Sequence, residues 1–233
     1  MRILVTRPAE EGERLARLLR ERGHEPILSA TMDIQLEDGP DLSLENTKAI
    51  LVTSANGVRA LARRTRNRDV PLFVVGPQTA EAARAAGFIS VRDAKGDSKI
   101  LAQSVREWTA PGGGSLVYAA GDAMTDDLVS TLSGQGFDVE VLRLYRTRER
   151  ETLSNAAAAA LASDVIDAVM LFSPRSARIF VRQVLRADLQ RNCERVAGLC
   201  ISPAIAAALF PLHFAHVQIA AQPNRDSMLD LLG

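Results

Sequence analysis

Short apolar runs alternate with helical patterns along most of the chain, and one stretch shows the repeating unit clearly. Met170, Leu171 and Phe172 form an apolar run typical of a buried strand. Ser173 then fits a helix N-cap, with Pro174 at the first helical position, where its missing N–H is no loss. The following apolar residues have the spacing of a helix packed on a sheet: Ala177, Phe180, Val181, Val184 and Leu185.

A strand that leads directly into a capped helix has a chemical consequence. The first backbone N–H groups of the helix have no partner within it, and the helix dipole is positive at that end. Both features favour an anion such as a carboxylate at the junction. The sequence therefore predicts an anion-binding loop at residues 173–176.

The same strand–loop–helix unit recurs, which indicates two similar lobes. Residues 50–58 resemble residues 170–177, and residues 73–80 resemble residues 199–206. A third pair consists of residues 3–8, with a helix that ends at Gly23, and 116–121, with a helix that ends at Gly136. Three unit types that each occur twice favour an internal duplication. The alternative is that these weak repeats are only the turn and cap residues found between strands and helices in any α/β protein.

Strands that alternate with helices predict doubly wound parallel sheets, and hence an α/β fold. Segment 30–44 contains Gly39-Pro40 and is acidic, so we predict an irregular crossing there. Residues 111–114 predict a turn and not a phosphate loop. The predicted strands are 3–6, 26–29, 49–53, 72–75, 90–92, 116–120, 138–145, 170–172, 199–201 and 217–220.

The distribution of these strands predicts a discontinuous domain. Residues 36–145 contain enough strands to close a sheet alone, whereas residues 148–233 supply only three. The second sheet reaches the same number of strands as the first only if the two N-terminal strands join it. We therefore expect one domain from residues 1–35 and 146–233, with residues 36–145 inserted. The two crossings, near Ile34 and Tyr145, would form the hinge.

Composition and charge exclude several classes of protein. The net charge is zero, aromatic residues make up only 4%, and none is interleaved with the arginines between Arg59 and Arg68, so nucleic-acid binding is not expected. The alanine run at 156–162 is too short to span a membrane, and the N-terminus does not resemble a signal peptide. Cys193 and Cys200 fit no metal or redox spacing, which predicts reduced thiols. We expect a cytoplasmic monomer with no membrane association.

Catalytic signatures that depend on cofactors or metals are missing from the sequence. There is no G-x-G-x-x-G after a strand, no Walker loop, no G-x-S-x-G and no H-E-x-x-H. His213 and His216 have no accompanying ligands, so they predict a surface pair and not a metal site. We therefore expect neither a metal nor a cofactor, and a nucleotide-binding enzyme is disfavoured.

What remains is a set of hydroxyl, glycine and proline residues at the carboxyl ends of the predicted strands. Open α/β sheets bind their ligands outside those ends. The alternative is that each residue only caps a helix. The loops are Thr6-Arg7-Pro8, Thr53-Ser54-Ala55-Asn56, Gly76-Pro77, Gly121-Asp122, Ser173-Pro174-Arg175-Ser176 and Ser202-Pro203.

These loops, in this order, resemble the uroporphyrinogen-III synthase family over nearly the whole chain. Each motif is weak alone, and their combined order makes the resemblance coherent. The motifs are Thr6-Arg7-Pro8 with Leu15, Leu19 and Gly23, then residues 53–58, 75–80, 144–147, 172–177 and 201–203.

The resemblance implies two flavodoxin-like α/β domains joined by a two-stranded linker, and a cofactor-free cyclising lyase. Its substrate would be hydroxymethylbilane, a linear tetrapyrrole rich in carboxylates, which the enzyme closes to uroporphyrinogen III with inversion of ring D. Tyr145 matches the family's tyrosine near the cleft and would be catalytic, or else would only pack at the hinge. The residues expected to bind substrate are Thr6, Arg7, Ser54, Ala55, Asn56, Gly76, Thr79, Gly121, Ser173, Pro174, Arg175, Ser176 and Ser202.

Three positions depart from the family's pattern. Ile205 stands where many members carry a hydroxyl, as Thr79 does in the other lobe. Thr125, in the acidic stretch 122–127, replaces a common basic residue, and Ala30-Thr31 replaces a frequent Ala-Pro. These departures leave open a paralogue with another ligand, or a non-catalytic two-lobed protein that binds a carboxylated small molecule.

Overall fold

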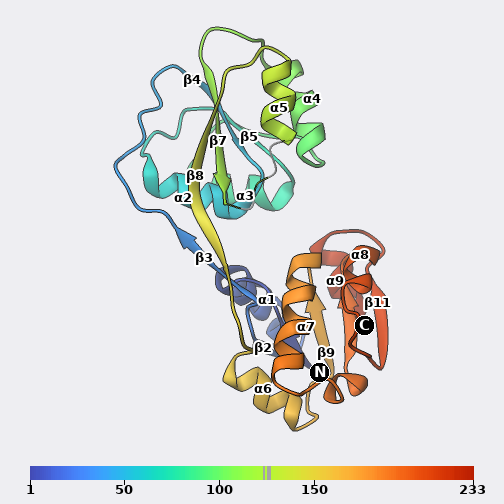
Figure 1. Cartoon of the computed structure of the whole chain (residues 1–233). Helices are drawn as coiled ribbons and strands as arrows, with labels where there is room; N and C mark the ends of the chain where they lie inside the picture. The colour runs from blue at the N-terminus through green and yellow to red at the C-terminus, as the bar shows by residue number, and fades with distance from the viewer. Residues whose placement is uncertain (123, 125–126) are drawn as a thin grey trace. The chain divides into compact units, whose positions relative to one another are not determined.

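The computed structural model describes residues 1–122, 124 and 127–233, which form two compact units (Figure 1). Unit 1 consists of Met1–Asp33 and Arg148–Gly233, and unit 2 is Ile34–Thr147. The boundaries expected from the sequence, 36 and 145, lie just inside the limits of unit 2. The chain passes between the units twice, in β3 (Met32–Leu36) and β8 (Val139–Glu149), which are neighbours in one sheet.

Unit 1 is built on a parallel sheet with the order β11-β10-β9-β1-β2. The N-terminal strand β1 lies inside this sheet, because Ile3 pairs with Pro26 on one side and with Ala168 on the other. The sheet therefore joins segments from both ends of the chain. Its strands are β1 (Arg2–Val5), β2 (Glu25–Leu28), β9 (Ala168–Leu171), β10 (Ala197–Cys200) and β11 (His216–Ile219).

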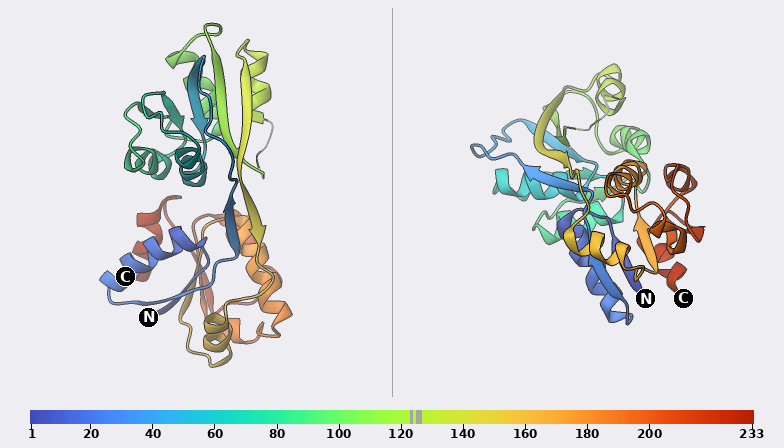
Figure 2. Two further views of the ribbon diagram at one scale, coloured as in Figure 1. Left: turned by 90° about the vertical axis from the view of Figure 1, so that its left-hand side faces the viewer. Right: turned by 60° about the horizontal axis from the view of Figure 1, so that its bottom comes forward.

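Helices cover both faces of this sheet (Figure 2). On one face, α1 (Ala9–Glu21) and α9 (Arg225–Leu229) pack against Ile3 and Val5 of β1. On the other face, Leu4 contacts the core formed with α6 (Asn155–Ala162), α7 (Pro174–Arg186) and α8 (Pro203–Ala207). Two short 3₁₀ helices, Asn192–Arg195 and Asp230–Leu232, complete unit 1.

Helix α7 begins as the sequence predicts, since Ser173 is its N-cap and Pro174 its first residue. Four of the five predicted core positions on α7 are buried. The exception is Leu185, whose side chain is 43% exposed, so its assignment to the buried face was wrong. Gln183, two positions earlier, is 1% exposed and lies nearer the centre of the buried face.

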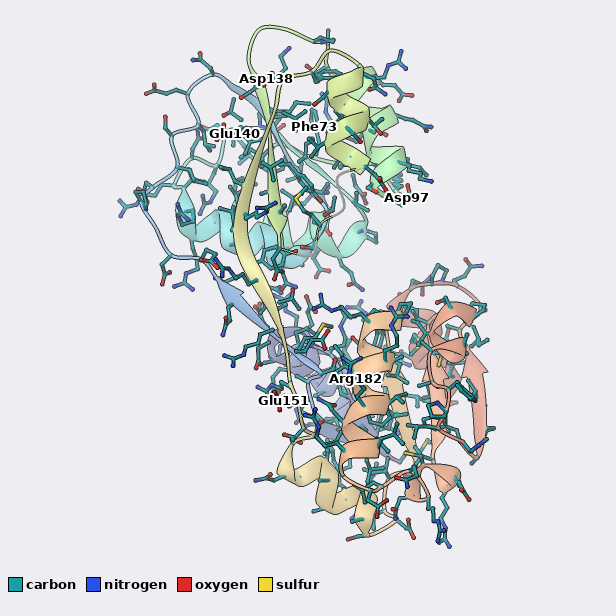
Figure 3. The ribbon with its side chains drawn as sticks, in the orientation of Figure 1. Phe73, Asp97, Asp138, Glu140, Glu151 and Arg182 are labelled. Carbon is teal, nitrogen blue, oxygen red and sulfur yellow. The ribbon has the colours of Figure 1, made fainter. Side chains whose placement is uncertain are left out.

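The buried Gln183 attaches α7 to the segment that follows β8. Its Nε2 donates to the carbonyls of Arg150 and Thr152, at 2.8 and 3.1 Å. Beside it, the Arg186 guanidinium pairs with the carboxylate of Glu151 at 3.1 Å, and Arg182 on the same helix pairs with Glu149. One member of each pair, Glu151 and Arg182, is labelled in Figure 3. The point where β8 enters unit 1 is thus fixed to the helix that starts at Ser173.

Unit 2 has a six-stranded sheet with the order β3-β8-β7-β4-β5-β6, which is parallel from β8 to β6. Helices α2 (Ala55–Arg64) and α3 (Pro77–Ala85) pack on one face, and α4 (Ser98–Trp108) and α5 (Asp127–Gly134) on the other. The remaining strands are β4 (Thr47–Val52), β5 (Leu72–Val74), β6 (Val91–Asp93) and β7 (Ser115–Gly121). The predicted doubly wound α/β fold is confirmed for both units.

Strand β3 corrects the expectation that segment 30–44 is irregular throughout. The Glu37 amide donates to the Leu144 carbonyl, and the Arg150 amide donates to the Thr31 carbonyl. From Thr31 to Glu37 the residue number rises, whereas the bonded residue changes from Arg150 to Leu144, so the two strands run antiparallel. Strand β3 was missed although Met32, Ile34 and Leu36 alternate with Asp33 and Gln35 as in a strand, because Gly39-Pro40 and the acidic residues of the segment were given more weight.

The strand orders confirm the internal repeat. Read from β2 and from β8, the sheets run β2-β1-β9-β10-β11 and β8-β7-β4-β5-β6. In this alignment β1 corresponds to β7, β9 to β4, and β10 to β5, which are the three pairs of units that the sequence matches. The two lobes therefore share one architecture, although the chain enters it at different strands.

The two cysteines and the two C-terminal histidines singled out from the sequence can be placed in unit 1. Cys193 and Cys200 are free and fully buried, and burial raises the pKa of their thiols to about 12 and about 11. Both thiols are therefore protonated and unreactive at neutral pH. His213 and His216 are exposed, and the described residues contain no group of three or more side chains suited to a metal. Across the same residues, no helix is both long and apolar enough to cross a membrane.

Candidate active site at the carboxyl edges of the two sheets

The predicted loops lie at the carboxyl edge of each sheet, since neighbouring strands there are parallel. In unit 1 this edge collects the loops that follow β1, β9 and β10. In unit 2 it collects the loops that follow β4, β5 and β7. Each edge therefore brings together residues that are far apart in the sequence.

In unit 2, the phenol of Tyr145 meets the loop that follows β4. Tyr145 Oη lies 2.9 Å from Ser54 Oγ, and either oxygen can be the donor. Ser54 is also the N-cap of α2, because its Oγ accepts the Gly57 N–H at 3.0 Å. The hydroxyl of Ser54 thus joins the capped helix to Tyr145, the residue for which the family resemblance implies a catalytic role.

A second pair of hydroxyls involves the residue before Ser54 and a tyrosine of the core on the opposite face of the sheet. Thr53 Oγ1 is 3.0 Å from Oη of Tyr118, which is on β7 and only 5% exposed. The sequence reasoning missed Tyr118. Tyr118 could have been found because it is a tyrosine within an otherwise apolar strand. A buried tyrosine hydroxyl usually has a hydrogen-bond partner, so a polar neighbour was to be expected.

Two glycines allow this close packing. A Cβ on Gly57 would lie 2.9 Å from the Ala119 carbonyl oxygen and 2.9 Å from Cγ1 of Val52, so α2 begins very close to the sheet. A Cβ on Gly121 would lie 2.5 Å from two ring carbons of Tyr145. Gly121 is therefore brought together with Tyr145 and Ser54, as neighbours on β7, β8 and the end of β4.

Other predicted residues of unit 2 already have partners within the protein. The Asn56 carboxamide oxygen accepts from the Arg59 guanidinium, and Ala55 packs on the core under α2. Gly76 has φ of 81°, which favours glycine, and its amide donates to Asp93 Oδ1 at 2.8 Å. Thr79 is 5% exposed. The amide of Gly76 is thus occupied by a carboxylate of the protein itself.

In unit 1, Thr6 links three strand ends. It is fully buried, and its Oγ1 donates to the Met170 carbonyl at 2.8 Å. Its own carbonyl accepts from the amide and from the hydroxyl of Thr31, at 3.1 and 3.2 Å. The side chain of Thr6 therefore shapes the edge from within.

Arg7 follows Thr6 and lies at the surface of the same edge. Its guanidinium carbon is 4.8 Å from the centre of the Phe172 ring, within the range of a cation–π contact. Its Nη2 pairs with Glu11 at 3.3 Å, and the side chain is 20% exposed. Arg7 is thus a half-buried cation held between an aromatic ring and a carboxylate.

The Ser173 loop forms the centre of this edge. Ser173 Oγ accepts the Ser176 N–H at 3.0 Å and donates to Ser176 Oγ at 2.9 Å. Pro174 occupies the first helical turn, and Arg175 Nε donates to Glu149 at 3.3 Å from a side chain that is 39% exposed. Ser202, at the start of α8, is half-exposed and makes no capping hydrogen bond with its hydroxyl.

The comparisons with known proteins agree with this geometry. The sequence profile of the family described as uroporphyrinogen-III synthase HemD matches residues 13–230. The chain belongs to the uroporphyrinogen-III synthase family.

Two curated relatives carry related names. The porphyrin biosynthesis protein HemD of Ruminiclostridium josui is 26% identical over 246 residues, covering 99% of this chain and 48% of that protein. A putative uroporphyrinogen-III synthase of Methanocaldococcus jannaschii is 31% identical over 87 residues, covering 35% of this chain and 36% of that protein. The chain thus spans about half the length, or less, of these two relatives.

Solved structures support the fold. The uroporphyrinogen-III synthetase of Helicobacter pylori has a TM-score of 0.64 at 14% identity, covering 100% of this chain and 98% of that one. A mutant uroporphyrinogen III synthase of Thermus thermophilus has a TM-score of 0.54 at 19% identity, covering 100% and 97%. At such identities these matches concern the architecture alone.

The departures from the family pattern fall mostly on buried positions. Ile205 is 1% exposed and packs in the core of unit 1, so the absent hydroxyl is replaced by apolar packing. Thr31 donates an amide hydrogen bond that a proline could not make. Thr125 lies outside the described residues.

The arginines between Arg59 and Arg68, which lie in α2 and just after it, are only partly solvated. Arg64 donates to the Pro40 carbonyl at 3.0 Å, and Arg68 donates to the carbonyls of Ala62 and Ala86 at 3.1 and 2.9 Å. These two arginines therefore tie loops of unit 2 together. Arg63 and Arg66 are exposed.

Proposed function

We propose that this chain catalyses the closure of hydroxymethylbilane to uroporphyrinogen III, with loss of water and inversion of ring D. Membership of the family supports the reaction class. The observation that carries the proposal is the hydrogen bond between Ser54 and Tyr145 at the carboxyl edge of unit 2. It holds a phenol where open α/β sheets bind their ligands.

The reaction depends less on a strong acid or base than on how the protein positions the substrate. The hydroxyl of hydroxymethylbilane leaves as water, so a donor that protonates it lowers the barrier. In our proposal the phenol of Tyr145 is that donor, and the proton released on ring closure restores it. Since closure without inversion competes, the protein must also hold the flexible chain in one folded pose.

The carboxylates of the substrate would bind to the loops at the edges. Arg175 is the best-suited group in unit 1, because its partly exposed guanidinium meets Glu149 through Nε and lies in the first turn of α7. Arg7 and the hydroxyl of Ser202 would add contacts from the neighbouring loops. Thr6, Gly76 and Thr79, which are buried or already hydrogen-bonded, would shape these loops and not touch the substrate.

Further properties follow from the same proposal. The net reaction is a dehydration without change of oxidation state, so it requires no redox cofactor.

The proposed localisation is the cytoplasm, because the two free cysteines fit a reducing compartment. Both faces of each sheet are covered within the unit itself, which favours a monomer; light scattering of the purified chain would test this.

The decisive experiment supplies hydroxymethylbilane to the purified chain and separates the product isomers by chromatography after oxidation. We expect uroporphyrinogen III in excess over the spontaneous isomer I of the buffer control. Isomer I alone, at the rate of the buffer control, would remove the enzyme proposal. Binding of hydroxymethylbilane without turnover would then identify a non-catalytic carboxylate-binding protein.

A further inference from the structure

The direction of the Tyr145 side chain departs from the alternation of its strand. Along β8, Val139 and Val141 pack against the core under α4 and α5, whereas Leu142 and Leu144 pack against the core under α2 and α3. Simple alternation would place Tyr145 with the two valines. Tyr145 instead packs against the α2 and α3 core, on the same side as Leu144.

A shift of register between β7 and β8 accounts for this change of face. Ala120 pairs with Arg143, but the next residue, Gly121, pairs with Tyr145. One step along β7 therefore corresponds to two steps along β8, which is a β-bulge. Bulges re-aim a side chain and are common beside active sites. Without the extra residue, the phenol would lie on the face opposite to Ser54.

Gly121 provides the space into which the re-aimed ring fits. A Cβ at this position would lie 2.5 Å from Cε2 and Cζ of Tyr145 and 2.9 Å from Oη. The backbone is also fixed here, because the Asp122 amide donates to the Tyr145 carbonyl at 3.1 Å. Asp122 Oδ1 in turn accepts the Thr147 N–H at 3.0 Å. Glycine is thus required by the ring and not by a special φ.

We propose that the bulge, Gly121 and Ser54 together position the Tyr145 phenol, and that Gly121 is a positioning residue of the active site. The bulge selects the face, Gly121 provides the space, and Ser54 holds the oxygen. The placement stands on the geometry of unit 2 alone. Its catalytic consequence rests on the proposed function, so the two parts need separate measurements.

The placement is measured by fluorine NMR. The chain has only two tyrosines, so 3-fluorotyrosine gives two resonances, which Tyr118→Phe and Tyr145→Phe assign. We expect Gly121→Ala and Ser54→Ala to shift the resonance of Tyr145, and to shift that of Tyr118 much less. The matched control is Gly134→Ala, whose Cβ meets nothing within 4 Å. An unchanged Tyr145 signal in Gly121→Ala would overturn the placement.

A stability measurement covers the case in which Gly121→Ala folds poorly. If the added methyl group collides with the ring, the loss of melting temperature should disappear when Tyr145→Ala removes that ring. The double variant Gly121→Ala/Tyr145→Ala should then have the same melting temperature as the control double variant Gly134→Ala/Tyr145→Ala. An equal loss with and without the ring would show that Gly121 serves another purpose, and the proposal would fail.

The catalytic part is measured by a kinetic cycle. Gly121→Ala should lower kcat about tenfold to a thousandfold, the range of one positioned proton donor, with KM within about twofold of the wild-type value. In the Tyr145→Phe background the same substitution should change kcat by less than about twofold. An equal drop in both backgrounds contradicts a role through the phenol. A wild-type chain without synthase activity removes the catalytic part, while the NMR result still decides the placement.

Discussion

The discontinuous layout of unit 1 leads to a quantitative prediction about fragments. Residues 148–233 alone lack β1, β2 and α1, which supply Ile3, Leu4, Val5, Leu15 and Leu19, each at most 3% exposed. Burying one such side chain stabilises a protein by about 1.5–3 kcal/mol, so these five contribute about 7–15 kcal/mol. That sum equals the whole free energy of unfolding of a typical domain, about 5–15 kcal/mol. We expect the 148–233 fragment to be unfolded.

Two matched polypeptides complete the experiment. Residues 34–147 contain all the strands described for their sheet, and lose only the first two residues of β3 and the last two of β8. We therefore expect this fragment to melt cooperatively. Residues 1–33 joined by a short glycine linker to 148–233 should also fold, because Thr31 and Arg150 are hydrogen-bonded across the join. Far-UV circular dichroism during heating measures all three. A cooperative melt of 148–233 alone would refute the reasoning.

Three further predictions concern single side chains. Tyr145→Phe should lower kcat about tenfold to a thousandfold with KM and melting temperature near wild type, and full activity would leave Tyr145 a packing role only. Ser173→Ala should destabilise the protein by about 0.5–2 kcal/mol through the lost cap, and should raise KM if the loop binds carboxylate; an unchanged KM would make it a cap only. Cys193 and Cys200 should resist a thiol reagent at pH 8 in the folded protein and react after denaturation, since burial holds their pKa values at about 12 and about 11; rapid reaction of the folded chain would contradict their burial.

Much of the fold could be predicted because its signals are local. Ser173 and Pro174 mark the start of α7, and Gly23 has the positive φ expected after α1. The membership of β1 in unit 1 followed from counting strands. Leu185 was misassigned because its exposure depends on what lies opposite the helix, which periodicity alone does not report. Strand β3 was missed for another reason: its apolar alternation indicates a strand, but the Gly39-Pro40 pair and the acidic residues beyond it favoured an irregular crossing.

The candidate site was less accessible to sequence reasoning. The loops could be found because hydroxyl and glycine residues follow apolar strands, but the partner of each hydroxyl could not. Thr6 bonds inward to Met170, whereas Ser54 bonds to Tyr145. The alternation along β8 even predicts the wrong face for Tyr145, because the bulge opposite Gly121 depends on the pairing of two strands.

The position of β1 within its sheet also sets an order of events on the ribosome. Strand β1 emerges well before its neighbour β9, which follows β2 by about 140 residues, a stretch that takes roughly 7–28 s to translate. Unit 2 is complete before β9 appears. Throughout that interval the apolar run Ile3-Leu4-Val5 has only β2 and α1 to cover it, so the nascent chain presents a natural binding segment for a chaperone.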